Sequence, residues 1–105
     1  MARVAALAPD LFFGSKIEET LTSAGHDVTV LARPEALPDG TELVIVDLDR
    51  VETLEPSPTV PVLAFYSHVD VEARQRGERA GFDLVVPRSR MAREMPALVE
   101  RLLGR

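Results

Sequence analysis

The sequence contains no cysteine, no tryptophan and few aromatic or basic residues. Without cysteine the chain forms no disulfide and offers neither a thiolate nucleophile nor a Cys-ligated metal site. There are 12 Lys and Arg against 17 Asp and Glu, and this net charge of -5 argues against a general nucleic-acid binder. Aromatic residues make up 5% of the chain, so platforms for stacking bases are not expected. No apolar run approaches the ~20 residues of a membrane helix, and the first residues show no signal-peptide pattern.

What remains is the composition of one small globular domain. The chain has 105 residues, of which 46% are hydrophobic and 28% are charged. This length accommodates a single core, so one domain is expected over residues 1–105. With its acidic balance, the sequence predicts a cytoplasmic protein that binds neither nucleic acid nor membranes.

Short apolar or β-branched runs alternate with segments of helical spacing. Strands are predicted over residues 3–8, 27–31, 42–47, 60–66 and 82–86, and helices over residues 11–24, 69–80 and 91–103. The two remaining connections each hold a pair of prolines, which leaves short helical turns at 35–37 and 51–54. The predicted fold is α/β and flavodoxin-like: a doubly wound parallel five-stranded sheet of order 2-1-3-4-5, with shortened second and third helices.

Ligands of such sheets bind beyond the carboxyl ends of the strands. The candidate pocket residues at this edge are Asp10, Asp47, Asp49, Tyr66, Ser67 and Arg88. Asp47 ends the most apolar strand, so its carboxylate is expected at the rim of the sheet. It is either a nucleophilic carboxylate that forms an acyl phosphate, or a side chain that binds loop amides or pairs with Arg88.

Four blocks, residues 11–28, 42–48, 60–70 and 79–88, carry a family resemblance in their order and spacing. Together they resemble a response-regulator receiver domain of two-component signalling over almost the full length of the chain. The resemblance implies the receiver fold and places Asp47 at the phosphoacceptor position of the family.

Several pocket positions depart from the receiver pattern. Ala8 and Pro9 stand where receivers carry the acidic pair that binds magnesium, and Asp10 lies just beyond. Tyr66 aligns with the receiver Ser/Thr, with Ser67 one place later, and Arg88 aligns with the receiver Lys. Asp10 and Asp47 would form a weak Mg²⁺ site at best, so no cofactor is expected. Arg88 is expected to clamp Asp47 in a fixed ion pair.

These departures predict an atypical, degenerate pseudo-receiver that stands alone, is not an enzyme and acts without phosphorylation. It is expected to bind a protein partner, or a second copy of itself, through the face formed by residues 69–80, 82–86 and 91–103. Arg88, Arg90 and Arg93 are the candidate interface residues. The alternative is a working receiver in which Asp47 is phosphorylated. A flavin-binding protein is a third reading, although the loop that would bind the flavin phosphate is unsuited to it.

Other residues allow more than one interpretation. His68 and Asp70 either contribute to a metal site with Asp47 or are a solvated histidine and a helix N-cap. His26 is expected at the surface. Phe12 and Phe13 are adjacent on one helix and cannot face the same core, so one of them is exposed to solvent or a partner, or covers a loop.

Overall fold

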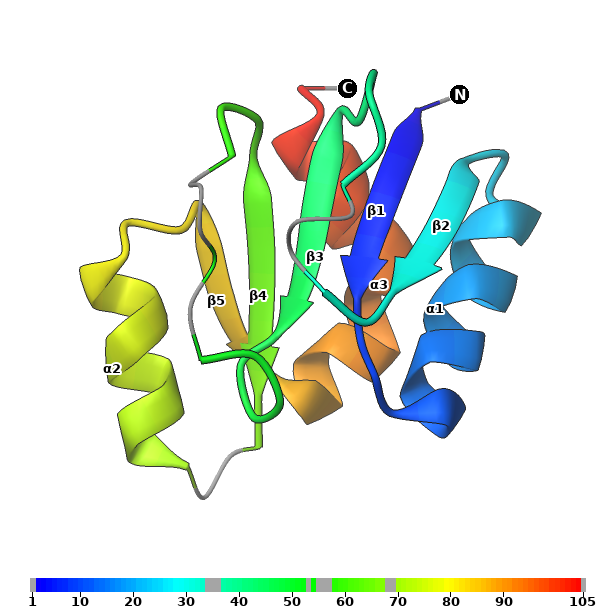
Figure 1. Cartoon of the computed structure of the whole chain (residues 1–105). Coiled ribbons are helices and arrows are strands. Elements are labelled where there is room, and N and C mark those ends of the chain that lie inside the picture. The colour runs from blue at the N-terminus through cyan, green and yellow to red at the C-terminus, as the bar shows by residue number, and fades with distance from the viewer. Residues whose placement is uncertain (1, 34–36, 53, 55–57, 68–69, 105) are drawn as a thin grey trace.

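The computed structural model describes residues 2–33, 37–52, 54, 58–67 and 70–104. Its five strands are β1 (Arg3–Leu7), β2 (Asp27–Leu31), β3 (Leu43–Asp47), β4 (Val62–Tyr66) and β5 (Leu84–Pro87). Its three helices are α1 (Leu11–Ser23), α2 (Val71–Arg79) and α3 (Arg88–Leu102) (Figure 1). Each strand and helix therefore forms where the alternation of apolar runs and helical spacing predicts it, with differences at the ends.

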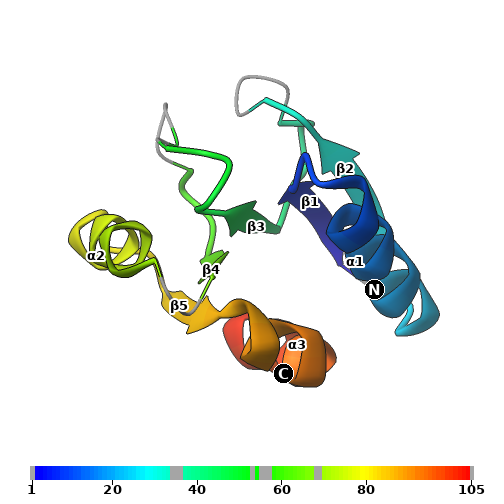
Figure 2. The same cartoon turned by 90° about the horizontal axis from the view of Figure 1, so that it is seen from below.

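The strands form one parallel sheet of order β2-β1-β3-β4-β5, which confirms the predicted topology. Every residue of β3 and β4 is buried, as continuous apolar runs require in strands covered on both faces. Seen along the strands, α1 and α3 lie on one side of the sheet and α2 on the other (Figure 2). All carboxyl ends of the strands point toward the same edge (Figure 1).

Each face of the sheet has its own apolar core. Under α1 and α3, the core contains Ile17 and Met95 together with alternate residues of the strands. On the opposite face, Leu48, Val51 and Leu54 pack with the other strand residues and with α2. The segment after β3 thus contributes its own side chains to the cover of this second face.

The connection between β2 and β3 and the connection between β3 and β4 each contain a pair of prolines. Their described residues form no helix. The predicted turn at 35–37 falls mainly on residues 35 and 36, which lie outside the described residues, as does residue 53 of the predicted turn at 51–54. Residues 51, 52 and 54 are not helical. In place of shortened helices, Val51 and Leu54 are buried directly against the sheet.

The end of α1 overturns the expectation that His26 is a surface residue. Gly25 adopts φ 93°, a left-handed conformation that glycine takes at little cost, and the His26 amide donates to the Leu21 carbonyl at 2.9 Å. This turn directs His26 inward, where it is buried. Its Nδ1 accepts from the Ala2 amide at 3.3 Å, and its Nε2 lies 3.0 Å from Glu100 Oε1.

Helix α3 begins at Arg88, three residues before the predicted start at Met91. Pro87 is extended at φ -67° and ψ 152° and precedes the helix without a side-chain cap. The apolar spacing from Met91 onward marks the face that packs on the sheet, whereas the first turn of the helix lies beyond the sheet edge. The prediction therefore missed a turn whose side chains do not serve the core.

Candidate functional site

Four of the predicted pocket residues meet at the carboxyl edge of the sheet. Asp10 precedes α1, Asp47 ends β3, Asp49 follows it, and Arg88 opens α3. We call Asp10, Asp47 and Asp49 the acidic cluster. The Arg88 guanidinium lies among them, with Nη2 3.1 Å from Asp47 Oδ2 and 3.5 Å from Asp49 Oδ2, and Nη1 3.7 Å from Asp10 Oδ2. Arg88 therefore forms the ion pair with Asp47 that the sequence suggests, and contacts the two other carboxylates as well.

Asp47 is the most deeply buried member of the cluster, with none of its side chain exposed. Its Oδ1 accepts from the Asp49 amide at 3.0 Å, and its Oδ2 accepts from Arg88. Burial raises the pKa of Asp47 above its ordinary value, and the Arg88 charge and the Asp49 amide lower it only in part. Both carboxylate oxygens are thus occupied by donors within the chain.

Arg88 is held by aromatic rings as well as by carboxylates. Its guanidinium carbon lies 4.8 Å from the ring centroid of Phe13 on α1 and 5.3 Å from that of Phe65 on β4. The two rings are themselves 4.8 Å apart. A planar guanidinium stacks on aromatic faces while its edges donate to carboxylates, which an ammonium group cannot reproduce.

Asp10 and Asp49 each have a second role. Asp10 is the N-cap of α1, where Oδ1 accepts from the Phe12 amide at 3.0 Å and from the Phe13 amide at 3.4 Å. Asp49 Oδ2 accepts from the Ser67 amide at 2.8 Å, which ties the segment after β3 to the end of β4. Both side chains are therefore positioned by the backbone around them as well as by Arg88.

Comparison with known proteins agrees with the sheet topology. No family model and no curated protein matches the chain. Its structure resembles the receiver domain of the TMAO respiratory system response regulator TorR with a TM-score of 0.84, at 19% identity over 99% of this chain and 98% of that one. The chain has the receiver-domain fold.

Two further receivers give the same result. A response regulator receiver protein from Burkholderia phymatum matches with a TM-score of 0.80, at 19% identity over 99% of this chain and 96% of that one. A two-component response regulator from Clostridium difficile matches with a TM-score of 0.82, at 12% identity over 100% and 98% of the two chains. The full-length coverage on both sides agrees with the resemblance drawn from the sequence blocks.

Within this receiver fold, Tyr66 faces away from the acidic cluster. Side chains alternate along β4, so that Phe65 contacts Arg88 whereas Tyr66 is buried in the core of the opposite face, with Leu48 and Val51. Ser67 binds Asp49 through its amide. Of these two predicted pocket residues, Tyr66 therefore belongs to the opposite face, and Ser67 contacts the cluster through its amide.

The other candidates that the structure describes, Asp70, Arg90 and Arg93, have their contacts outside the cluster. His68 lies outside the described residues, and Asp70 is the N-cap of α2, where it accepts from the Ala73 amide at 2.9 Å. Among the described residues, no three His, Asp or Glu side chains are grouped to hold a metal ion. Arg90 and Arg93 both pair with Glu94 on the outer face of α3.

The adjacent phenylalanines of α1 separate as expected. Phe13 is buried against Arg88 and Phe65, and Phe12 is 91% exposed. The sequence analysis missed Phe13 and Phe65 as parts of the site. The strand register would have been needed to find Phe65, because Phe65 is the β4 partner of Asp47 and thus lies beside it.

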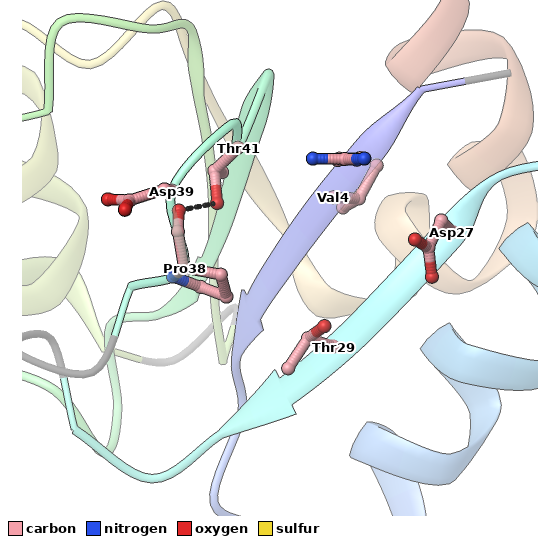
Figure 3. A pocket seen from close by; sticks show the side chains of 7 residues that line it. Val4, Asp27, Thr29, Pro38, Asp39 and Thr41 are labelled. Carbon is pink, nitrogen blue, oxygen red and sulfur yellow. Dashed lines mark hydrogen bonds between the residues drawn. The ribbon is translucent and has the colours of Figure 1, made fainter.

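A pocket of about 150 Å³ lies at the opposite edge of the sheet, near the amino ends of β1 and β2 (Figure 3). Its lining includes Arg3, Asp27, Thr29 and Asp39, and the Thr41 hydroxyl donates to the Pro38 carbonyl at 2.7 Å. Its side chains come from the start of the strands, so the pocket is separate from the acidic cluster.

In the part of the chain that the structure describes, no helix has the length and hydropathy to span a membrane.

Proposed function

We propose that the chain is an atypical receiver that acts as a signalling module through protein–protein contacts, without phosphorylation of Asp47 and without catalysing a reaction. The observation that carries this proposal is the position of Arg88, whose guanidinium lies among three carboxylates and against two aromatic rings. In this arrangement the positive charge of Arg88, which would attract a phosphoryl group, is already neutralised by carboxylates of the chain itself.

The surroundings of Asp47 support this reading. A carboxylate that attacks phosphorus needs an exposed oxygen and nearby donors for the incoming phosphoryl oxygens. Asp47 has no exposed surface, and each of its oxygens accepts a hydrogen bond from within the chain. With Tyr66 directed to the opposite core, no side-chain hydroxyl of β4 stands ready to bind a phosphoryl oxygen.

The residues do not fit the Mg²⁺ ion that receivers use for phosphorylation. Magnesium requires carboxylate oxygens in near-octahedral geometry. Asp10 is committed to the N-cap of α1, and the guanidinium of Arg88 lies where the carboxylates converge. A divalent cation would have to displace Arg88 from both of its ring contacts and all three of its ion pairs.

The face formed by α2, β5 and α3 is the proposed binding surface, for a protein partner or for a second copy of the chain. Arg93 exposes 68% of its side chain there and Arg90 37%, beside Glu94. On α2, Val71 is 60% exposed and Arg74 pairs with Glu78 at 3.3 Å. This face therefore carries ion pairs on both helices and, on α2, the exposed aliphatic side chain of Val71.

Intact-mass spectrometry tests the proposal. The chain is incubated with magnesium and a small phosphodonor such as acetyl phosphate, with Asp47→Ala as the control and circular dichroism to show that both proteins are folded. We expect no phosphoryl adduct on the wild-type chain. An adduct that disappears in Asp47→Ala would refute the proposal and establish the alternative, a working phosphoacceptor.

The binding surface is tested separately by site-specific photocrosslinking in cells. A crosslinking residue replaces Arg93 on the proposed face and, in a matched control, the exposed Lys16 on α1. We expect defined protein adducts from position 93 and none from position 16. Adducts from position 16 alone would assign the contact to another face of the molecule.

A further inference from the structure

A hydrogen bond connects helix α2 to the segment that follows Asp47. The Arg76 guanidinium donates through Nη2 to the Leu48 carbonyl at 2.6 Å, across 28 residues of sequence. Its Nε is buried and has no acceptor among the described residues. The hydrogen bond to Leu48 therefore holds this side chain in place.

The packing at the same point is close. A methyl group on Gly77 would lie 2.7 Å from Leu48 Cδ1 and 3.1 Å from a Val85 methyl, so a larger residue at position 77 would require Leu48 to shift. Leu48 itself is 2% exposed. Helix α2 thus contacts Leu48 twice, through its carbonyl and through its side chain.

Leu48 in turn connects two members of the acidic cluster. It lies between Asp47 and Asp49, and its amide donates to the Phe65 carbonyl at 2.9 Å. Asp47 and Asp49 are both held by Arg88, and Asp49 also by the Ser67 amide. The Asp49 amide also donates to Asp47 Oδ1 at 3.0 Å, so the Asp47 carboxylate is hydrogen-bonded to the backbone on the far side of Leu48.

We propose that Arg76 is a positioning residue that couples the acidic cluster to α2 through the Leu48 carbonyl. The inference rests on the proposed function, because α2 forms part of the proposed binding surface. The hydrogen bond from Arg76 to the Leu48 carbonyl is the contact through which the binding surface depends on the acidic cluster. Contiguous contacts alone do not establish coupling, so the measurement has to be one of energetic or structural dependence.

A double-mutant cycle read by amide chemical shifts tests the coupling. Arg88→Met disturbs the cluster, and Arg76→Met removes the bond to Leu48. We expect Arg88→Met to shift the amide resonances of Val71–Arg79 in the wild-type background, and this shift to be lost in the Arg76→Met background. Chemical shifts report local geometry, so a lower global stability of the variants does not imitate the effect.

Two controls make the result specific. Arg79→Met removes another arginine of α2, and the response to Arg88→Met should persist in that background. Arg76→Lys retains a donor that reaches toward Leu48, and it should restore part of the response. If Arg76→Met does not fold, the Arg76→Lys and Arg79→Met backgrounds are compared instead. The response of α2 to Arg88→Met should then be weaker in the Arg76→Lys background than in the wild-type chain, and unchanged in the Arg79→Met background.

The proposal is overturned if α2 responds equally in the presence and absence of Arg76, or if Arg88→Met leaves the α2 resonances unchanged. Neither result depends on whether Asp47 takes up a phosphoryl group. Failure of the coupling and failure of the proposed function are therefore distinguished by different measurements, one by chemical shifts and one by mass.

Discussion

Replacing Arg88 by methionine tests whether the acidic cluster depends on its internal cation. Methionine keeps an unbranched apolar side chain that still packs on Phe13 and Phe65, so the change removes mainly the charge. Among the described residues, Arg88 is the cation within ion-pair distance of the cluster. The variant would leave three carboxylates without a counter-charge.

The size of the effect follows from burial. Unit charges ~4 Å apart interact by about 4 kcal/mol at an effective dielectric of ~20. Removing one partner of a fully buried pair lowers the free energy of unfolding by about 3–5 kcal/mol. Arg88 exposes 30% of its side chain, and solvent screens its contacts with Asp10 and Asp49. We therefore expect Arg88→Met to lower the free energy of unfolding by about 2–3 kcal/mol at pH 7.

The pH dependence has a definite sign. Burial already places the pKa of Asp47 above its ordinary value in the folded chain, and without Arg88 that pKa rises further. A group whose folded pKa lies above its unfolded value stabilises the fold when protonated and loses that contribution as the pH rises. The stability deficit of Arg88→Met should therefore be largest near pH 7 and shrink as the pH falls toward 4.

Urea unfolding at pH 7 and at pH 4–5 measures both quantities. Arg90→Met is the matched control, because Arg90 is in the same helix and pairs with Glu94 at the surface. We expect the control to change the free energy of unfolding by less than about 1 kcal/mol. A variant Arg88→Met as stable as the control at pH 7, or a deficit that grows in acid, would refute the reasoning.

Three further predictions are tested by urea unfolding. Arg88→Lys keeps the charge but loses the ring contacts and the fork of donors, so we expect about 1–2 kcal/mol less stability; a wild-type value would show that charge alone suffices. His26→Leu leaves the buried Ala2 amide without its acceptor, with an expected loss of about 1–3 kcal/mol, and His26→Gln should lose less. Phe12→Ser, at a solvent-exposed site, should stay within about 0.5 kcal/mol of wild type, whereas Phe13→Leu should lose more than about 1 kcal/mol; equal effects would contradict the assigned burial.

The fold could be predicted because the apolar pattern is dictated by the sheet. Strands β3 and β4 are covered on both faces and read as unbroken apolar runs, and right-handed crossovers then leave few possible strand orders. The ends of the helices and strands were harder to predict from the sequence. The first turn of α3 carries no core residue, so helical spacing could not place its start at Arg88.

The site was predicted only in part. The pairing of Arg88 with Asp47 follows from their places after the carboxyl ends of β5 and β3, at the same edge of the sheet, and it is present in the structure. The inward position of His26 depends on a left-handed turn at Gly25 and on a distant partner, Glu100, which local sequence does not reveal. The face of β4 to which Tyr66 belongs required the register against β3, because a shift of one residue exchanges Phe65 and Tyr66.

The position of Arg88 at the first residue of α3 is unfavourable for the helix taken alone. Helix N-termini carry partial positive charge and favour anions, as Asp10 illustrates at the start of α1. Arg88 is stable at this position because its attraction to the acidic cluster outweighs its repulsion by the positive end of the helix dipole. The cluster therefore fixes where α3 begins. Through Leu48 and Arg76 the same cluster lies next to α2. Helix α3 thus begins at the cluster, and α2 is hydrogen-bonded to the residue between two of its carboxylates, which supports a role in holding the proposed binding surface in place over a role in phosphoryl chemistry.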